Sequence, residues 1–360
     1  MFASSGQLVR GGKERRLKMA RHPLGSRGGQ RSWIYIISAL LVIIAAVVLI
    51  YGLGPFGKNK EGPGSVLPPV NVPEANQITL PKPKPAPVVK TEPNLPTIAP
   101  GPIGEPNEKI SALIIETTAL INAKPSKIIE ARDKLNDALM MPMSAQQRTF
   151  VRERLSELAD KWLFSRTVFP DDKLCSSYTV KPGDRLQTIG EQFKVPYEIL
   201  MTINNINRPE VLQAGGVIKV INGPFHVRIY RSMFTMDLYL QNTFVRSFAV
   251  GLGKPGRETP AGLWVVKPGG KLIKPPWTDP DTGRRYEPED PDYPLGSRWI
   301  GLEGIGGAAK GRTGFALHGT KEPTQIGAAG SRGCIRLHNG DVILVYNLLT
   351  PVLSQVEVVD

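Results

Sequence analysis

Residues 226–250 read HVRIYRSMFTMDLYLQNTFVRSFAV, and this stretch decides the fold of the C-terminal part of the chain. Three short runs, 226–230, 237–240 and 244–250, are apolar or alternate between apolar and polar residues, and turn residues separate them. That pattern is typical of neighbouring β-strands. No long helical pattern follows until residues 341–349. The C-terminal part is therefore predicted to be a mainly-β domain.

A candidate nucleophile lies further along this domain. The stretches LHGT at 317–320 and SRGCIRLH at 331–338 hold one of the two cysteines of the chain and two of its four histidines. A thiol becomes a nucleophile when a base takes its proton, and His318 lies near enough in sequence to Cys334 to do so. Gly333 lets the backbone turn its amides toward a developing oxyanion. The pattern predicts thiol chemistry.

Two other uses of Cys334 compete with this interpretation. A disulfide with Cys175 would remove the nucleophile. A zinc site made of Cys334, His318 and His338 would lack a fourth ligand of clear spacing. We interpret His338 as structural or exposed, and expect no metal.

The segment GLGKPG at 251–256 superficially matches a dinucleotide-binding fingerprint. Such a fingerprint needs a helix directly after the glycines. Pro255 and Pro260 prevent that helix. The glycines are interpreted as a tight turn between strands, and no cofactor is expected.

Most of the net charge of +13 is concentrated at the N-terminus. Residues 1–32 form a basic tail with eight basic side chains against Glu14, so a nucleic-acid partner is not expected. Residues 33–53 are an uncharged apolar run, long enough to cross a bilayer core of about 30 Å as a single transmembrane helix. Because basic flanks stay cytoplasmic, we expect a single-pass protein of the cytoplasmic (inner) membrane with its catalytic part in the periplasm or cell envelope. A cleaved signal peptide, the rival interpretation, would have a shorter apolar region and a small-residue cleavage site.

A tether and a helical segment are predicted next. Residues 54–106 are crowded with proline and poor in aromatic side chains, which is typical of an extended Pro-rich linker. Residues 107–165 change to a helical period, and Ser144 followed by Gln147 indicates a capping box. We interpret this part as a short α-helical bundle that acts as a spacer, with a protein-docking surface as the alternative.

Residues 178–186 (YTVKPGDRL) and 204–207 (NNIN) belong to a pattern of strand, two helices and closing strand. On these motifs, residues 177–222 resemble a LysM domain. The resemblance implies a βααβ fold that binds glycan containing N-acetylglucosamine between loops 183–187 and 208–213. Peptidoglycan glycan strands are therefore an expected partner.

Residues 224–360 resemble the L,D-transpeptidase (YkuD-like) catalytic domain. The landmarks that carry this resemblance are VGLG at 250–253, TPAG at 259–262, PLGSRWI at 294–300, HGT at 318–320 and SRGCIR at 331–336. The resemblance implies that Cys334 attacks the L,D peptide bond of a peptidoglycan stem peptide and that His318 is its base. It further implies that the carbonyl of Gly319 orients the imidazole. Many members of the family have His where Arg332 stands, and we interpret this change as one that adjusts the catalytic activity and does not abolish it.

The remaining site residues surround the nucleophile in sequence. The backbone amides of Arg332, Gly333 and Cys334 are expected to form the oxyanion hole. Arg336 is a permanently charged fork that suits the carboxylate of a stem peptide, or else it braces the loop. Ser331 is assigned to the substrate-binding part of the site, and its hydroxyl is expected to hydrogen-bond within the loop.

The predicted function is a peptidoglycan L,D-transpeptidase that forms 3→3 cross-links through a cysteine thioester acyl-enzyme and is targeted to the wall by its LysM domain. One alternative is an L,D-carboxypeptidase that trims stem peptides. The other is a non-catalytic, LysM-based wall-binding scaffold. The insertion 267–291, rich in Pro, Gly, Asp and Arg, is either a lid over the cleft or a surface loop.

Overall fold

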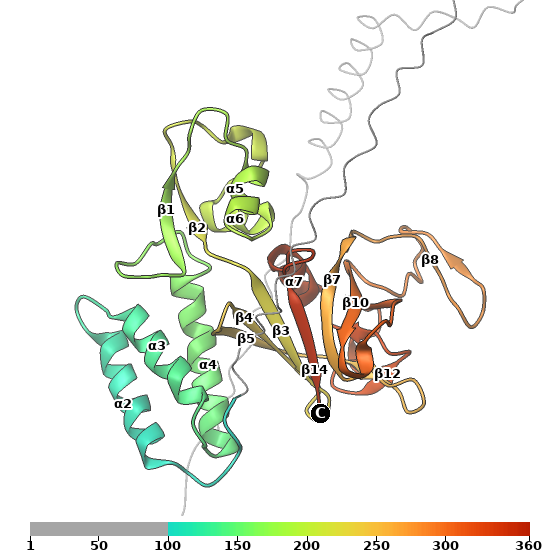
Figure 1. The fold of residues 1–360 in the computed structure, drawn as a ribbon, viewed down its shortest axis with the longest axis horizontal. Coiled ribbons are helices and arrows are strands. Elements are labelled where there is room, and N and C mark those ends of the chain that lie inside the picture. The colour runs from blue at the N-terminus through green and yellow to red at the C-terminus, as the bar shows by residue number, and fades with distance from the viewer. Residues whose placement is uncertain (1–99) are drawn as a thin grey trace, which may run out of the picture. The chain divides into compact units, whose positions relative to one another are not determined.

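A computed structural model describes residues 100–360 of the chain (Figure 1). The predicted basic tail 1–32, the predicted transmembrane helix 33–53 and the part 54–99 of the predicted linker lie outside the described residues. Among residues 100–360, no helix has both the length and the apolar character needed to cross a membrane.

Three helices open the described part of the chain. They are α2 (Glu108–Asn122), α3 (Ile128–Leu139) and α4 (Ala145–Trp162). Ser144 caps α4 by accepting a hydrogen bond from the amide of Gln147, whose side chain in turn reaches the Ser144 backbone. The predicted capping box is confirmed, and it fixes the first turn of α4.

A small module with two antiparallel strands and two helices follows. Its elements are β1 (Cys175–Thr179), α5 (Leu186–Gln192), α6 (Tyr197–Asn204), the short 3-10 turn η1 (Pro209–Val211) and β2 (Val217–Ile221). Leu186, Ile189 and Leu200 are buried in its core. Asp184 fixes the loop before α5 by accepting hydrogen bonds of 2.8 Å from the hydroxyl of Tyr178 and from a backbone amide. The predicted βααβ fold is confirmed.

The C-terminal part is built on one eight-stranded sheet, in the order β13-β11-β10-β7-β14-β3-β4-β5. Its strands are β3 (Phe225–Tyr230), β4 (Thr235–Leu240), β5 (Thr243–Ala249), β7 (Gly262–Leu272), β10 (Trp299–Gly306), β11 (Phe315–His318), β13 (Ile335–Arg336) and β14 (Gln355–Val359). Helix α7 (Asn339–Leu348) lies between β13 and β14 in the chain. The mainly-β prediction is confirmed.

The short elements around this sheet complete the domain. Two of them pair in parallel, β6 (Leu252–Gly253) with β12 (Ala329–Ser331), and two pair antiparallel, β8 (Trp277–Thr278) with β9 (Arg285–Tyr286). The 3-10 turns η2 (Gly307–Ala309) and η3 (Pro323–Gln325) lie in loops. No helix directly follows β6, but the predicted turn is shorter than expected: Leu252 and Gly253 belong to β6 itself, and the turn lies after them, around residues 255–257.

The strand register brings the two halves of the sequence motif together. Strands β11 and β13 run parallel, and His318 is the register partner of Arg336. Cys334 directly precedes β13, so in the same parallel register it lies level with Ala316, two residues before His318 on β11. The two motif segments, separated in sequence, thus become neighbours at one end of the sheet.

The helical segment packs against the sheet. Helix α4 packs against β5 at the edge of the sheet (Figure 1), and Arg152 of α4 forms an ion pair with Asp237 of β4, whose side chain is fully buried. The side chain of Asn136 in α3 accepts a 3.0 Å hydrogen bond from the Phe244 amide of the edge strand β5. An edge strand has backbone groups free to pair with other chains, and the helices that cover β5 hinder such pairing. The predicted spacer therefore supports the catalytic sheet as well as preceding it.

A buried lysine joins the βααβ module to the end of α4. The Nζ of Lys219 in β2 donates hydrogen bonds to three backbone carbonyls, those of Trp162 (2.5 Å), Ser165 (2.9 Å) and Thr167 (2.7 Å). Burial lowers the pKa of this ammonium. The lysine supplies donors to carbonyls at and beyond the end of a helix, which have no partner within the helix itself.

Candidate active site

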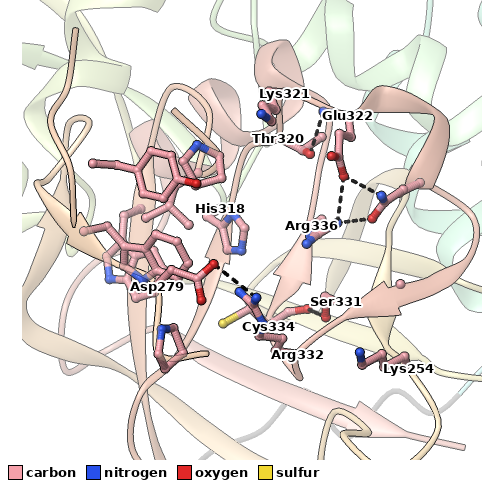
Figure 2. A pocket seen from close by; sticks show the side chains of 18 of the residues that line it. Lys254, Asp279, His318, Thr320, Lys321, Glu322, Ser331, Arg332, Cys334 and Arg336 are labelled. Carbon is pink, nitrogen blue, oxygen red and sulfur yellow. Dashed lines mark hydrogen bonds and ion pairs between the residues drawn. The ribbon is translucent and has the colours of Figure 1, made fainter. Parts of the chain in front are cut away.

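A pocket of about 490 Å³ opens at the end of β11 and β13 (Figure 2). The residues that line it come from the nucleophile loop, from β11, from the β8–β9 hairpin and from the segment 320–325. Cys334, His318 and Arg336, which the sequence predicted to act together, all line this pocket. Arg332 and Ser331 line it as well.

The loop around Cys334 is held in a fixed conformation by its neighbours. Gly333 has a φ of 111°, and a Cβ at this position would lie 2.7 Å from the ring of Phe315, so only glycine fits. Its carbonyl accepts a 2.9 Å hydrogen bond from the hydroxyl of Thr259. The buried hydroxyl of Ser331 donates to the Cys334 carbonyl at 2.6 Å and accepts from the Gly333 amide at 3.1 Å.

These contacts bear on two expectations. The Ser331 hydroxyl makes the expected hydrogen bond within the loop and donates its only hydrogen there, while its substrate-binding role stays a prediction. The Gly333 amide is engaged in the same way and is not free to meet an oxyanion. The amides of Arg332 and Cys334 remain as the oxyanion donors to consider.

The Cys334 thiol is partly exposed on the pocket wall. Burial raises its pKa, while a backbone hydrogen bond at Ala316 and the charge of Arg336 act in the opposite direction. Its sulfur makes a 3.8 Å contact with the carbonyl of Gly314. The surroundings thus favour a neutral thiol before substrate arrives.

The two competing uses of this cysteine find no support. Cys334 and Cys175 are both free, and Cys175 is buried in β1, where burial raises its pKa to about 12. The disulfide interpretation is therefore wrong. Within the described part of the chain no three His, Cys, Asp or Glu side chains are grouped to hold a metal ion, and His338 is exposed at the start of α7.

His318 is buried, with only 4% of its surface exposed. Its Nδ1 lies 2.6 Å from the Gly319 carbonyl oxygen, the contact that the family resemblance implied. A carbonyl can only accept, so Nδ1 carries the hydrogen and Nε2 is the basic nitrogen. The backbone of Leu295 also hydrogen-bonds the ring. Burial lowers the pKa of the imidazole to about 4, and the ring is stacked on Trp299 at 5.6 Å between centroids. His318 is thus a neutral, oriented base.

The carbonyl of Gly319 is itself held in place, partly by a residue that the motif analysis did not single out. The Gly319 amide donates to the Arg298 carbonyl at 3.2 Å. Asn339, the first residue of α7, donates from Nδ2 to the Thr320 carbonyl at 2.9 Å and accepts from the Ser297 amide at 3.0 Å. A Cβ on Gly319 would lie 2.2 Å from the Asn339 side chain, so glycine is required here as well. Nothing in the sequence marks Asn339 as important except its position just after the cysteine motif.

Arg336 points into the pocket and is braced there. Its Nη1 donates to the side chain of Gln325 and lies 3.7 Å from a carboxylate oxygen of Glu322 (Figure 2). The guanidinium has five N–H donors, so this bracing leaves donors for another group. The two roles that the sequence left open for Arg336 are therefore compatible.

Arg332 points from the nucleophile loop toward the β8–β9 hairpin. It contacts Asp279 and Asp281, and Asp279 lines the pocket together with Trp277 and Tyr286 (Figure 2). Sequence analysis did not assign a role to either aspartate. The only signal was the composition of the insertion 267–291, which identified the segment but not its partner.

The fold and the pocket together define a mainly-β catalytic domain in which a thiol and an oriented neutral imidazole share one cleft. Residues 224–358 match the YkuD family, described as the L,D-transpeptidase catalytic domain, and residues 178–220 match the LysM domain.

Curated relatives carry the same family name. The putative L,D-transpeptidase YkuD of Bacillus licheniformis is 28% identical over 174 residues, which cover 46% of this chain and 88% of that protein. The putative L,D-transpeptidase YqjB of Bacillus subtilis is 31% identical over 140 residues, which cover 38% of this chain and 73% of that protein. A solved L,D-transpeptidase from Mycobacterium smegmatis aligns over 41% of this chain and 64% of its own at 15% identity, with a TM-score of 0.29.

This chain belongs to the L,D-transpeptidase family and carries a LysM domain that supports targeting to the cell wall.

Proposed function

We propose that the protein forms 3→3 cross-links in peptidoglycan through a thioester on Cys334. The observation that carries the proposal is the 2.6 Å contact between His318 Nδ1 and the Gly319 carbonyl. It makes Nε2 the basic nitrogen of His318, in the pocket that Cys334 also lines. The donor is a stem peptide whose L,D peptide bond enters this pocket.

The resting pair is neutral in this mechanism. Burial raises the pKa of the Cys334 thiol and lowers the pKa of His318 to about 4, so thiol and imidazole are both uncharged at neutral pH. The positive charge of Arg336 favours the thiolate and disfavours the imidazolium. We therefore favour proton transfer to Nε2 as the sulfur attacks over a preformed ion pair.

The first half-reaction exchanges an amide for a thioester. The sulfur of Cys334 forms a bond to the carbonyl carbon of the donor, and His318 takes the thiol proton. The carbon–nitrogen bond then breaks, and the imidazolium returns the proton to the leaving D-amino acid. The oxyanion of the tetrahedral intermediate meets the amides of Arg332 and Cys334, where one donor can contribute ~2.7–4 kcal/mol.

The second half-reaction transfers the acyl group. An acceptor amine, the side-chain amine of a diamino acid in a neighbouring stem, attacks the thioester carbon, and His318 takes its proton. The carbon–sulfur bond breaks and Cys334 leaves as the thiol. If water replaces the amine, the product is a trimmed stem, which is the carboxypeptidase outcome.

Stem-peptide recognition is proposed for Arg336, together with its bracing role. Lys254 and Lys321 line the same pocket and add positive charge. Stem peptides carry carboxylates, and a guanidinium fork binds a carboxylate through paired hydrogen bonds.

The cellular setting is also a proposal. The apolar run 33–53 after the basic tail 1–32 supports a single-pass anchor in the inner membrane, with the catalytic domain in the periplasm or cell envelope. The LysM domain would hold glycan strands while the tether limits diffusion. Both would raise the concentration of stem peptide near Cys334.

The test is a comparison of muropeptides, by mass spectrometry, from cells that express the wild type or Cys334→Ala. The proposal expects 3→3 cross-linked dimers with the wild type and their loss with the variant. Loss of trimmed stems without loss of dimers would identify a carboxypeptidase. Unchanged muropeptides at equal protein levels would leave only the non-catalytic scaffold and would overturn the proposal.

A further inference from the structure

The β8–β9 hairpin, residues 277–286 and here called the flap, forms one wall of the pocket through Trp277, Asp279 and Tyr286. The rings of Trp277 and Tyr286 lie 5.9 Å apart across the two strands. The tip is ordered by its own hydrogen bonds, among them a 2.8 Å bond from the Asp281 amide to the Asp279 side chain. The flap is therefore a preformed unit that can move as one piece.

A chain of four charges ties the tip of the flap to the nucleophile loop. Arg332 contacts Asp281 at 2.7 Å through Nε and Asp279 at 3.1 Å through Nη2. Asp281 also contacts Arg257 at 3.0 Å, in the turn after β6. We call these four residues the latch. Because Arg332 is two residues before Cys334, the latch ends at the catalytic loop itself.

The side chains of the latch are partly exposed, so water can weaken its ion pairs. The side chains of Arg332, Asp281 and Arg257 are between 36% and 46% exposed, and only Asp279 is largely covered. Exposed ion pairs contribute little, and salt screens them over roughly 8–10 Å at ordinary ionic strength. Such contacts can hold a closed flap most of the time and still release it.

The flap covers only one side of the nucleophile. Figure 2 shows Asp279 on one side of Cys334 and His318, and Glu322 on the other. Residues of the segment 320–325 line this second side of the pocket, so an acceptor bound along them would not displace a closed flap. A cover of this kind can keep water from the reacting atoms without blocking an acceptor.

We propose that the latch holds the flap closed over the acyl-enzyme and thereby sets the share of thioester that goes to an amine rather than to water. This rests on the proposed function of Cys334. The latch residues are positioning residues, because Asp281 and Arg257 act on the pocket only through Arg332 and Asp279. The longer the flap stays closed, the larger is the share of thioester that is transferred to an amine and the smaller the share that is hydrolysed.

The decisive variant is Asp281→Asn, which removes two of the three ion pairs and does not line the pocket. Glu157→Gln is the matched control, since it removes the exposed Arg154–Glu157 pair of 2.8 Å on α4, outside the flap and away from the cleaved bonds. Arg257→Gln removes a single latch pair and should give an intermediate result.

Two readouts are taken on the purified full chain. The first is the rate of tryptic cleavage after Arg284 and Arg285 in the flap, which does not depend on catalysis. The second is the ratio of transfer to hydrolysis with a donor tetrapeptide and an amine acceptor. We expect Asp281→Asn to cleave faster and to lower the ratio by about threefold, the size that losing weak ion pairs supports. Added sodium chloride should move the wild type the same way and the variant less.

Each outcome decides something. Equal cleavage of wild type and Asp281→Asn, or the same change in Glu157→Gln, would overturn the latch. Faster cleavage with an unchanged product ratio would overturn its effect on partition. Absence of acyl transfer in the wild type would refute the proposed function instead. The cleavage rates would still show whether the latch holds the flap closed.

Discussion

Two sets of ion pairs in this protein use the same chemistry in opposite surroundings. Arg152 and Asp237 join α4 to the catalytic sheet with side-chain exposures of 14% and 0%. Arg332 and Asp281 join the flap to the nucleophile loop with exposures of 36% and 38%. The first pair is buried, which suits a fixed contact between α4 and the sheet. The second is exposed to solvent, which suits a movable contact between the flap and the nucleophile loop.

Burial decides what each pair costs to break. Burial raises the pKa of Asp237, and the nearby Arg152 and the hydroxyl of Ser247, at 2.5 Å, oppose that rise. Removing Arg152 leaves the buried carboxylate with hydroxyl donors but without its cation. At the flap, solvent replaces the lost partner, so a change there should alter motion more than stability.

The largest expected effect on stability is at the sealed joint. Arg152→Met leaves Asp237 buried without its cation, and we expect the free energy of unfolding to fall by about 3–5 kcal/mol. Urea denaturation measures it. Arg154→Met, on the same helix, removes an exposed pair with Glu157 and should cost less than about 1 kcal/mol. Similar losses in both variants would show that the buried Arg152–Asp237 pair costs no more to break than an exposed pair.

Acid should destabilise the same interior. Burial lowers the pKa of both His318 and His226 to about 4. The unfolded chain, with an ordinary histidine pKa near 6.5, binds more protons between these values, so stability present above pH 6.5 is lost as pH falls toward 4. We expect a loss of roughly 3 kcal/mol for each imidazole over this window.

Denaturation measured at a series of pH values tests this expectation. His226→Gln keeps an acceptor for the Gln355 amide, which now donates to His226 Nδ1 at 3.2 Å, and should reduce the slope by about half of the histidine contribution. A slope equal to that of the wild type would show that His226 is not a buried neutral imidazole.

The joint between the LysM domain and α4 should be weaker than the Arg152 joint. Lys219→Met keeps the volume of the side chain but leaves three carbonyls without their donor, and we expect a loss of about 2 kcal/mol. Lys181→Met, an exposed lysine of the same domain, is the control and should be close to neutral. A neutral result for Lys219→Met would mean that the junction is held by apolar contacts alone.

The smallest expected change in stability is at the flap. Asp281→Asn should leave the urea midpoint of the full chain unchanged, because its partners remain solvated. Denaturation measured beside the proteolysis experiment checks this. A large fall in the midpoint would make the flap part of the rigid fold and contradict its description as a movable cover.

Local patterns made a large part of this molecule predictable. The capping box at Ser144 and the βααβ module depend on neighbours in sequence, and both were predicted correctly. The motif around Cys334 and His318 identified the pocket residues, and the family resemblance added the carbonyl of Gly319. Such features are fixed by backbone conformation within a few residues.

The long-range pairs could not be predicted in this way. Arg332 and Asp281 meet only when the insertion folds back over the site, and Arg152 meets Asp237 only when α4 packs on the sheet. The sequence shows charged residues in both places but not their partners. The hydrogen bond of Ser331 within its loop was predicted, but its partners, the Cys334 carbonyl and the Gly333 amide, are visible only in the folded loop.

The central claim is that Cys334 carries the acyl group, and mass spectrometry of the intact protein tests it most directly. Purified protein mixed with a donor tetrapeptide, without acceptor, should gain the mass of the donor minus its terminal D-amino acid. Peptide mapping should place that mass on Cys334, and Cys334→Ala should show none. An adduct on another residue, or turnover of the donor by Cys334→Ala, would contradict the account.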